Sequence, residues 1–542
     1  MRVYLETFGC QMNELDSELV RGQLSALGYS FVESDREAQV VLYNTCSVRE
    51  QAEQKAYSRV GAIGVRKREG EDLILGILGC MAERDGVDLF RRHPQVDVLC
   101  GPAELDKLPQ LIDNVRRARS SARASDAPRR TATRERGVAL AGNRSRRSAT
   151  LAAAEDGLEA LDLSRAFDPS AREQPWSAYV RITRGCNKFC TYCVVPYTRG
   201  AEVHRPPEHI VDECKRLADA GATEVTLLGQ TVNHYRYTAG TAVTVGGHAA
   251  PQVGPGLQAF RAGAAPAANT TTFADLLWKI HEAVPAIERL RFVTSYPRDF
   301  GSDVLQVMRD APRICRYLHA PAQSGSDAVL ARMNRGYTVG EYRDFVARVF
   351  EALPDATLAG DLIVGFPGES DADFDATCEL VRSLPFKNNF IFKYSPRPGT
   401  VAIDRYPDDV PDEVKRWRNN TLLAIQGETS ARVHASWAGR RVEVLFDEVR
   451  SRPTPVDAAA PAGMVPLRVS ASSGGVTGVP DSTPAAPLAE RWQAVGRTRG
   501  DLIVAVDLPD ETAARALRGR SAWVVTRPGG ALLLRGALED VS

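Results

Sequence analysis

The sequence lacks several features that would place it in common classes of protein. Lys and Arg total 68, and Asp and Glu total 68, so overall charge implies no acidic or basic partner. The most apolar run, "LILGILGCMA", is about half the length that a membrane-spanning helix needs. The N-terminal "MRVYLETFGC" has no charged segment followed by an apolar one, so we expect no signal peptide. These absences predict a cytoplasmic protein that does not bind membranes.

Common catalytic signatures are also missing. The chain has no H-E-x-x-H metal motif, no phosphate-binding P-loop and no serine nucleophile elbow. It does contain ten cysteines, in a chain that we expect in a compartment where thiols stay reduced. Ten cysteines there indicate metal or redox chemistry before disulfide bonds.

The first part of the chain, residues 1–112, alternates apolar runs with helical patterns. Three runs, "RVYLETFGC", "VVLYNTC" and "LILGILGC", are rich in Val, Leu and Ile and are predicted to be buried parallel strands. Two intervening stretches, "NELDSELVRGQLSALG" and "VREQAEQKAYSRVGAIGVRK", are predicted to be amphipathic helices, the first ending at Gly28. Strand-helix alternation of this kind predicts an α/β domain with a parallel sheet.

Residues 113–172 differ in composition. Eleven Arg and no Lys occur between Arg116 and Arg147, and the only acids there are Asp126 and Glu135. Because almost no large apolar side chains are present, we expect a disordered, solvated linker. The alternative is a basic strap that lies over an RNA backbone.

The central part, residues 173–410, again alternates strand and helix patterns. Repeated β-α units predict a partial (βα)6 barrel, in which chemistry occurs at the carboxyl ends of the strands. A Gly/Ala/Pro/Thr-rich stretch at 237–272 is predicted to be an exposed insertion without chemistry. The six strand candidates are "WSAYVRIT", "EVTLLGQ", "RLRFVTS", "RYLHAPAQ", "TLAGDLIVGF" and "NFIFKYS".

The remainder is predicted to be a helical connector at 411–436 followed by an all-β domain at 437–542. Short strands with Gly and Pro at the turns, such as "RRVEVLFDEV" and "DLIVAVDLP", favour a small β-barrel. A Pro/Ala/Ser/Gly-rich insertion at about 452–488 interrupts it.

The stretch "RITRGCNKFCTYCVVPYTRG" holds Cys186, Cys190 and Cys193. A structural zinc site needs a fourth Cys or His, and none is found at the usual spacing. A four-iron cube held by three thiolates keeps one iron free for a small molecule. The loop also follows a predicted barrel strand directly, where a barrel enzyme places its active site. These residues therefore predict a 4Fe–4S cluster whose fourth ligand is a substrate.

A second triplet, Cys10, Cys46 and Cys80, is spread along the N-terminal domain. Each cysteine follows a predicted parallel strand, and ligand sites of open α/β sheets collect at that edge. The alternative is that each cysteine is a small buried hydrophobic residue. Three cysteines in equivalent places favour a second cube with a free iron. Core packing is the better interpretation of the other four, Cys100, Cys214, Cys315 and Cys378.

The cysteine loop resembles the signature of radical S-adenosylmethionine (SAM) enzymes. Two such triplets in this order are similar to the methylthiotransferase family, and within it to the MiaB-type branch that acts on isopentenyladenosine in tRNA. The stretches that carry the resemblance are "TFGCQMNELDSE", "NTCSVREQAEQK", "GCNKFCTYCVVPYTRG", "QSGSDAVLARMNRGYT", "DLIVGFPGES" and "YSPRPGT".

The resemblance implies a cofactor set and a reaction. One 4Fe–4S cluster cleaves SAM to a 5′-deoxyadenosyl radical, and the auxiliary 4Fe–4S cluster of Cys10, Cys46 and Cys80 delivers a methylthio group to carbon 2 of the adenosine beside the anticodon. It further implies a monomer and an electron donor such as flavodoxin or ferredoxin. The SAM contacts that it implies are Tyr192, Gly229, Gln230, Gln323, Ser324, Asp361 and Glu369.

The C-terminal barrel resembles the TRAM domain with which this family holds tRNA. The run "RWQAVGRTRGD" places Arg491, Arg497 and Arg499 beside Trp492, and such a set suits RNA, with cations on phosphates and a ring for stacking. The alternative is a turn with ordinary surface arginines. Departures from the family pattern leave pocket packing open and remove no cysteine; they are His204, Thr231, Tyr296, Ala320 and Ala322.

Other functions remain open at this point. Threonylcarbamoyladenosine methylthiotransferases and the branch that modifies a ribosomal protein share the chemistry. A non-catalytic iron–sulfur RNA-binding protein is the alternative from another class, and it would not cleave SAM.

Overall fold

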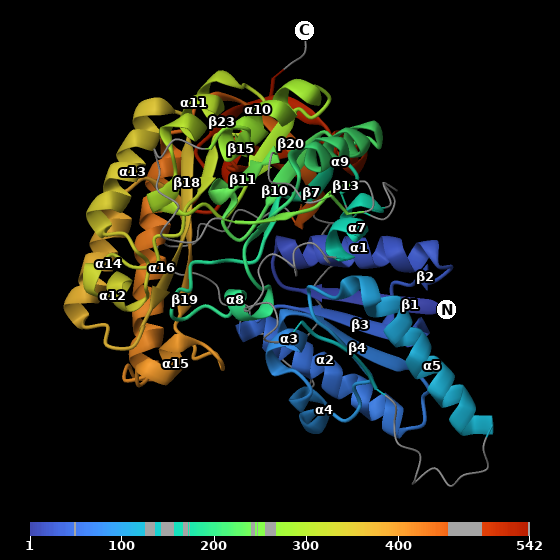
Figure 1. Cartoon of the computed structure of the whole chain (residues 1–542). Coiled ribbons are helices and arrows are strands. Elements are labelled where there is room, and N and C mark those ends of the chain that lie inside the picture. The colour runs from blue at the N-terminus through green and yellow to red at the C-terminus, as the bar shows by residue number, and fades with distance from the viewer. Residues whose placement is uncertain are drawn as a thin grey trace, which may run out of the picture. The chain divides into compact units, whose positions relative to one another are not determined.

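The computed structural model describes residues 1–47, 50–124, 136–141, 157–165, 172, 174–239, 244–245, 248–254, 267–453 and 490–539. The chain divides into two compact units, Met1–Val433 and His434–Ser542 (Figure 1). Among the described residues, no helix combines the length and apolar character needed to cross a membrane.

The N-terminal part of the first unit is a six-stranded parallel sheet, in the order β2-β1-β3-β4-β5-β6. Helices cover both of its faces, which explains why every residue of β3 and β4 is buried. The three strands predicted from sequence, β1, β3 and β4, are confirmed. The strands are β1 (Arg2–Phe8), β2 (Ser30–Phe31), β3 (Val40–Thr45), β4 (Ile74–Gly79), β5 (Val98–Cys100) and β6 (Gly137–Ala139).

Helices α1 and α5 pack on one face of this sheet, and α2, α3 and α4 pack on the other (Figure 1). Helix α1 ends as predicted, because Gly28 takes a left-handed conformation with φ of 81° and donates its N–H to the Ser25 carbonyl. The helices are α1 (Gln11–Ala26), α2 (Glu50–Arg68), α3 (Cys80–Asp85), α4 (Asp88–Arg92) and α5 (Leu108–Ala124), with 3-10 turns η1 (Asp35–Glu37) and η2 (Leu105–Lys107).

The segment predicted to be a disordered linker contains ordered structure, so that prediction is wrong for its described parts. Helix α5 continues to Ala124, β6 pairs with β5, and α7 (Gly157–Leu163) buries Leu158 and Leu161. The physical reason is that strand pairing needs no apolar side chains, while arginines can be held by acids, as Arg119 is by Asp97 at 2.7 Å. Residues 125–135 and 142–156 lie outside the described residues.

The central part of the first unit is a curved array of six parallel strands, and all six predicted strands are confirmed. They form two parallel groups, β16-β10-β7 and β17-β18-β19, which a parallel bridge between Leu290 and Ile314 connects. The array is therefore a partial (βα)6 barrel. Its strands are β7 (Ser177–Arg181), β10 (Glu224–Leu228), β16 (Arg289–Phe292), β17 (Tyr317–His319), β18 (Thr357–Val364) and β19 (Phe386–Lys393).

The barrel helices begin at strong caps. Thr272, Thr338 and Ser370 each accept a hydrogen bond from a backbone N–H three residues on, and the acid at that position reciprocates. The helices are α9 (Pro207–Asp219), α10 (Phe273–Ala283), α11 (Ser302–Asp310), α12 (Asp327–Arg332), α13 (Val339–Ala352), α14 (Asp371–Ser383), α15 (Val401–Arg405) and α16 (Asp412–Ala435), with turns η5 (Val232–His234) and η7 (Pro297–Asp299).

The insertion at 237–272 is less exposed than predicted. Strands β11 (Arg236–Thr238) and β15 (Thr270–Thr272) pair with each other, and β14 (Gln252–Val253) pairs with β9 (Val203–His204). A minor hairpin joins β12 (Thr244–Val245) to β13 (His248–Ala249). Tyr237 is buried and donates its hydroxyl to the Ala250 carbonyl at 3.0 Å, because the base of the insertion closes against the barrel. Residues 240–243, 246–247 and 255–266 lie outside the described residues.

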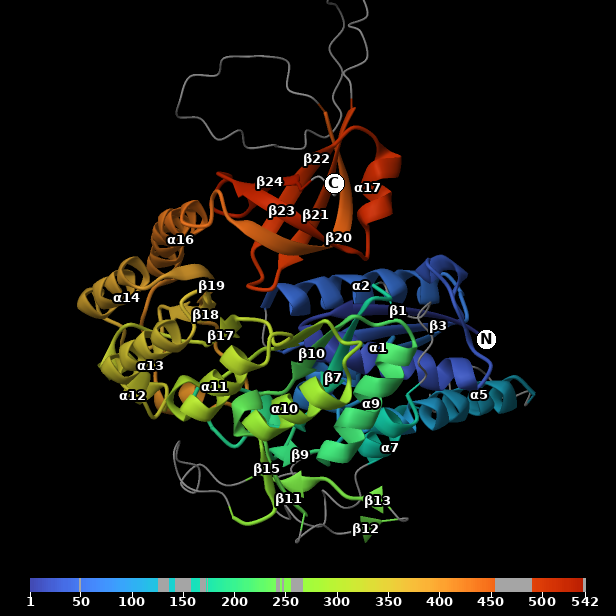
Figure 2. The same ribbon diagram turned by 90° about the horizontal axis from the view of Figure 1, so that it is seen from above.

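The second unit is a closed five-stranded barrel in the order β20-β21-β22-β24-β23, which confirms the predicted small β-barrel (Figure 2). Its interior is filled by alternating apolar residues such as Val444, Phe446 and Val524. The insertion predicted at 452–488 lies almost entirely outside the described residues. The elements are β20 (Arg441–Pro453), β21 (Glu490–Thr498), β22 (Ile503–Leu508), α17 (Glu511–Leu517), β23 (Ser521–Arg527) and β24 (Leu534–Leu538).

Candidate functional site

The N-terminal cysteine triplet lies at one edge of the first sheet. Strands β1, β3 and β4 are neighbours, and the ends of β1 and β3 and of β3 and β4 are paired in register. Cys46 and Cys80 directly follow their strands, and Cys10 comes two residues after β1. The parallel sheet therefore brings together three cysteines that are 34 or more positions apart in sequence.

The thiols of this triplet interact electrostatically. A hydrogen bond with the thiol of Cys46 is the main reason why the pKa of Cys10 falls to about 5. Burial raises the pKa of Cys80, and the negative charge of Cys10 adds to that rise. The Cys10 thiol also donates to Oδ1 of Asn13 at 3.2 Å. The three side chains thus belong to one small site.

Asparagine and glycine residues hold this edge in place. The side chains of Asn13 and Asn44 are buried, and Asn13 Nδ2 donates to Asn44 Oδ1 at 2.9 Å. Asn44 Nδ2 in turn donates to the Asn13 carbonyl at 2.8 Å. Gly79 has φ of 86°, and a Cβ there would lie 2.5 Å from Asn44 Oδ1. Only glycine allows the chain to turn from β4 into the helix that begins at Cys80.

The second triplet lies on one loop, between β8 (Thr183–Arg184) and β9, which also holds the short helix α8 (Val195–Thr198). Gly185 has φ of 68°, and a Cβ there would lie 1.9 Å from the Ala201 carbonyl oxygen. The loop is closed by the Cys186 N–H, which donates to the Gly200 carbonyl at 3.1 Å. Local backbone geometry therefore fixes the positions of these cysteines.

The environment of this loop raises the pKa values of two of its cysteines and so disfavours free thiolates. Burial raises the pKa of Cys186 to about 12, and the negative charges of Glu202 and Cys190 contribute to the rise. Burial and the charges of Cys190 and Cys186 also raise the pKa of Cys193. Arg335 supplies a compensating charge, since its guanidinium donates to Sγ of Cys190 at 3.4 Å.

Both triplets fit a four-iron cube better than a single ion. Among the described residues, no three His, Cys, Asp or Glu side chains are arranged to hold one metal ion. In a cube each thiolate binds a different iron, so the three sulfurs need not converge on one point. Three cysteines per site, grouped and close to a cationic side chain, suit a cube with one iron free of protein ligands.

Helix α8 connects the two triplets, because it packs against α3, the helix that begins at Cys80 (Figure 1). Arg199, just after α8, is buried and forms an ion pair with the fully buried Asp16 of α1 at 2.8 Å. Its charge opposes the rise in the pKa of Cys80 and helps to lower that of Cys10. The cluster loop is thus tied directly to the other cysteine site.

A cavity of about 770 Å³ opens between the N-terminal sheet and the barrel. Gly9 and Ser47 of the sheet edge line it on one side, and Cys193 of the loop lines it on another. Its volume is in the range of sites for small molecules and cofactors. The cavity is therefore lined by one cysteine of the loop and by the residues next to Cys10 and Cys46. Barrel residues that line it include Gln323, Asp361, Ile363, Ile391 and Tyr394.

Three of the residues predicted to contact SAM line this cavity, namely Tyr192, Gln323 and Asp361. Gln323 has φ of 70° and joins the end of β18 through a bridge to Leu362. Gly229 and Gln230 follow β10 and do not line the cavity. A Cβ on Gly229 would lie 2.2 Å from Thr183 Oγ1, so that glycine is required for packing.

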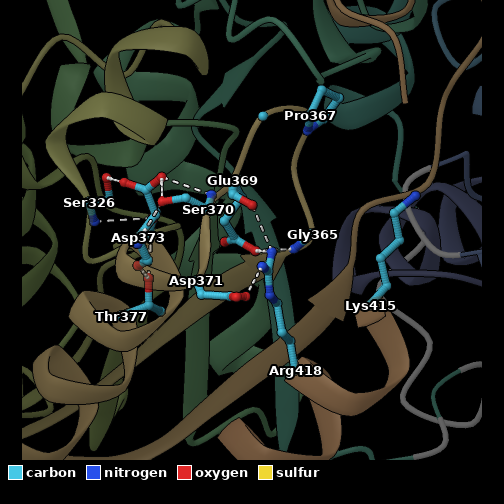
Figure 3. Close-up of polar contacts among 12 residues, drawn as sticks. Ser326, Gly365, Pro367, Glu369, Ser370, Asp371, Asp373, Thr377, Lys415 and Arg418 are labelled. Carbon is cyan, nitrogen blue, oxygen red and sulfur yellow. Dashed lines mark hydrogen bonds and ion pairs between the residues drawn. The ribbon is translucent and has the colours of Figure 1, made fainter. Parts of the chain in front are cut away.

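Glu369 and Ser324, which were also predicted to contact SAM, do not line the cavity, and their contact with SAM stays a prediction. The hydrogen bonds of Glu369 are drawn in Figure 3. Buried Glu369 accepts hydrogen bonds from the Gly365 N–H at 2.6 Å and from Arg418 at 2.8 Å. The Ser324 hydroxyl lies 3.3 Å from that of Thr377 on α14. Carboxylate and hydroxyl groups at strand ends also serve to brace helices, and these two residues do so for α14 and α16.

Sequence reasoning missed a buried polar cluster beneath the cysteine loop. Lys188 Nζ lies 2.6 Å from both His234 Nε2 and Asp299 Oδ2, and His234 Nδ1 lies 3.4 Å from Glu202. Lys188 also lies over the ring of Tyr296 at 4.0 Å. The signal available was the position of Lys188 between two cysteines. Arg199 and Arg335 were likewise present in the quoted stretches "YTRG" and "MNRGYT".

The predicted RNA contacts of the second unit are paired with acids. Arg497 lies 3.0 Å from Asp501, and Arg499 lies 2.6 Å from Glu443. Trp492 is half-buried on β21, and the side chain of Arg491 lies outside the described residues. The remaining cysteines, in contrast, are buried as predicted; they are Cys100, Cys214, Cys315 and Cys378.

Two parts of the chain match models of known protein families. The model of the "Uncharacterized protein family UPF0004" matches residues 2–101, and that of the "Radical SAM superfamily" matches residues 180–381. The tRNA-2-methylthio-N(6)-dimethylallyladenosine synthase of Rhodopirellula baltica is 41% identical over 85% of this chain and 86% of its own. The enzyme of the same name from Burkholderia thailandensis is 39% identical over 84% of this chain and 87% of its own.

The chain belongs to the tRNA-2-methylthio-N(6)-dimethylallyladenosine synthase family. This confirms the family to which the sequence was assigned by resemblance. The UPF0004 match contains all three N-terminal cysteines, and the radical SAM match contains the other three. Among solved structures, the radical SAM methyltransferase TsrM from Kitasatospora setae aligns with a TM-score of 0.45 at 16% identity, over 74% of this chain and 76% of that chain.

Proposed function

We propose that the protein is a radical SAM methylthiotransferase that converts isopentenyladenosine, beside the anticodon of tRNA, to 2-methylthio-isopentenyladenosine. The observation that carries this proposal is one cavity that is lined by Cys193 of the cysteine loop and by Gly9 and Ser47, the chain neighbours of Cys10 and Cys46. Each triplet leaves one vertex of a four-iron cube without a protein ligand, as two reactive clusters require. Relatives about 40% identical over most of their length carry the name of this activity.

Six cysteines would hold the cofactors. Cys186, Cys190 and Cys193 would hold the cluster that binds SAM, and Cys10, Cys46 and Cys80 the auxiliary cluster. When bound, SAM and the two clusters supply one-electron chemistry and the transferred sulfur. The protein contributes a buried environment in which hydrogen bonds to sulfur are strong, since water does not compete with them.

Several residues of the chain position these groups. Arg335 donates to Cys190 Sγ, and its guanidinium lies 4.8 Å from the centre of the Tyr296 ring, which limits its movement. Tyr192 packs edge-on against Phe366 at 6.4 Å and forms a wall of the cavity. Asp361 also lines the cavity, 3.4 Å from His319, and its carboxylate would accept hydrogen bonds from a bound ligand.

The substrate proposal is tested by nucleoside analysis of tRNA from a strain that lacks the gene. We expect 2-methylthio-isopentenyladenosine to disappear, isopentenyladenosine to accumulate, and complementation to restore the product. An unchanged nucleoside profile would reject this function. Loss of the threonylcarbamoyladenosine derivative instead, or of a ribosomal-protein modification, would assign the chain to one of the related branches.

A non-catalytic iron–sulfur RNA-binding protein makes a different prediction. It would release neither methionine nor 5′-deoxyadenosine from SAM after chemical reduction, whereas the proposed enzyme releases both. Flavodoxin or ferredoxin as the electron donor, a cytoplasmic location and a monomeric state are further parts of the proposal.

A further inference from the structure

The outer face of β23 and β24 in the second unit differs from the rest of that barrel. Along β23 the residues that point outward are Trp523, Val525 and Arg527, while Val524 and Thr526 are buried. The exposed fraction is 45% for Trp523 and 39% for Val525, which is high for apolar side chains of an ordered strand. The barrel thus presents an aromatic and aliphatic row to solvent.

Two arginines face each other across this hairpin. Arg527 of β23 and Arg535 of β24 are directly paired in the antiparallel register, and both are exposed. The two strands are labelled in Figure 2. Neither guanidinium is ion-paired or hydrogen-bonded to any other residue that the structure describes. Like charges directly opposite each other destabilise a sheet. An anion between the two guanidinium groups would remove that repulsion, since arginine binds phosphate with two parallel hydrogen bonds.

The turn of the same hairpin carries a solvent-exposed apolar residue. Leu532 is 83% exposed, more than any other large apolar residue among those described. It lies between Arg527 and Arg535 in sequence, in "RPGGALLLR". Apolar contact area beside paired cations is typical of surfaces that bind nucleic acids through both phosphates and bases.

Arg441 of β20 completes the face. Its guanidinium lies 3.8 Å from the centre of the Trp523 ring and pairs with Glu539 at 2.7 Å. The stacked arginine holds the indole in place, while Glu539 neutralises that one charge. The unneutralised charge of the face therefore comes from the two facing arginines. In contrast, Arg497 and Arg499 around β21 are each paired with a carboxylate.

We propose that the face formed by Trp523, Val525, Arg527, Leu532 and Arg535 is the RNA-docking surface of this unit, in place of the β21 arginines. It would bind phosphates at Arg527 and Arg535 and stack an unpaired base on Trp523. This inference rests on the proposed function in that the RNA is taken to be tRNA. Charge favours RNA over a protein partner, because two cations face each other with no acid to balance them.

The inference is tested on the full-length protein, by fluorescence anisotropy with a labelled anticodon stem-loop RNA at several salt concentrations. We expect R527A/R535A to weaken binding at least about tenfold and to lower the salt slope by about 1.4 to 1.8, the value for two lost phosphate contacts. W523A should weaken binding at least about fivefold with the salt slope unchanged, because stacking is not ionic.

The matched control is R450A/R497A, which removes the same number of positive charges from β20 and β21 of the same barrel, where Arg450 pairs with Glu448 and Arg497 with Asp501. It should change affinity less than about threefold, since those charges are already neutralised. R527K/R535K should keep most of the salt slope, and an unchanged melting temperature for each variant excludes unfolding. Equal losses in both double-alanine variants, or none in R527A/R535A, would overturn the inference and leave the face for another partner.

Reductive SAM cleavage without RNA separates this inference from the proposed function. R527A/R535A should cleave SAM as wild type does and should form product with raised KM and unchanged kcat. If neither the wild type nor any variant formed the methylthio product, the proposed function would be rejected. The difference in RNA affinity between the two double-alanine variants would still test the docking surface.

Discussion

The two cysteine triplets reach similar arrangements by opposite routes. Cys186, Cys190 and Cys193 lie within eight positions on one loop, which Gly185 and a few local hydrogen bonds shape. Cys10, Cys46 and Cys80 come from the ends of three neighbouring strands and are assembled by strand pairing. The first site depends on local sequence, and the second depends on the register of a sheet.

The difference teaches where each site is vulnerable. A local loop can be disturbed only by changes near it, whereas a site built from three strands is sensitive to changes in packing across the domain. The ion pair between Arg199 and Asp16 connects the two sites. The assembled site therefore relies on a residue of the local loop.

The largest expected effects come from the cysteines themselves. Both Cys10→Ala and Cys186→Ala should abolish methylthio product, and each should lower the iron content from about eight to about four per chain, because one cube is lost. Cys10→Ala should retain reductive SAM cleavage, and Cys186→Ala should lose it. Iron and sulfide analysis with Mössbauer spectra provides the measurement. If Cys10→Ala lost all eight irons, the two sites would not be separable.

Loss of the ion pair between Arg199 and Asp16, which connects the two sites, should greatly reduce the stability of the protein. Arg199→Gln leaves the buried Asp16 without this partner, and breaking a buried ion pair costs about 3–5 kcal/mol. We expect that loss in the free energy of unfolding, measured by denaturant titration. The control Arg91→Gln breaks an exposed pair with Asp88 in the same domain and should leave the midpoint unchanged. Equal midpoints for both variants would contradict a structural connection.

Substitution of a glycine near one cysteine site should affect the iron of that site alone. Gly79→Ala introduces an unfavourable φ and a contact with Asn44, so we expect a loss of about 1–3 kcal/mol and of the N-terminal cluster's iron alone. Gly185→Ala should remove the other cluster's iron instead. Gly28→Ala has a similar φ of 81° with open space around it, so it should keep all iron. Iron loss in Gly28→Ala would mean that φ alone, and not the contact, is responsible.

The smallest effect concerns thiol reactivity in protein stripped of iron. Because the thiolate is the reactive species, Cys10, with its pKa lowered to about 5, should be alkylated at pH 7 at least about tenfold faster than Cys186, with its pKa raised to about 12. Mass spectrometry of peptides from a time course with iodoacetamide measures this. Faster labelling of Cys186 would show that the two environments are reversed in the stripped protein.

Much of the fold followed from periodicity. The strands of both α/β regions were predicted because buried parallel strands are short, continuous apolar runs. The ordered parts of the 113–172 segment could not be predicted, because β6 is held by backbone pairing and Arg119 by an ion pair with Asp97. Neither interaction leaves an apolar pattern in the sequence.

The candidate site was predicted unevenly for a related reason. Tyr192, Gln323 and Asp361 line the cavity, whereas Glu369 accepts a hydrogen bond from Arg418 on a helix that comes later in the chain. Which partner a carboxylate meets depends on elements far away in sequence. The pairing of Arg499 with Glu443 was hidden for the same reason, because this ion pair joins segments that are far apart in sequence.

The sequence by itself determined the chemistry, through six cysteines in two groups of three. One group lies on a loop after a barrel strand, and each cysteine of the other group follows a strand of the parallel sheet. Cysteine spacing and apolar runs are local properties, so they can be recognised without coordinates. Only the tertiary structure decided that one cavity is lined by Cys193 and by the neighbours of Cys10 and Cys46, and that Arg199 of the loop pairs with Asp16 beside the N-terminal site. It also decided which arginines keep an unbalanced charge, because neutralisation and burial depend on contacts between segments that the sequence leaves far apart.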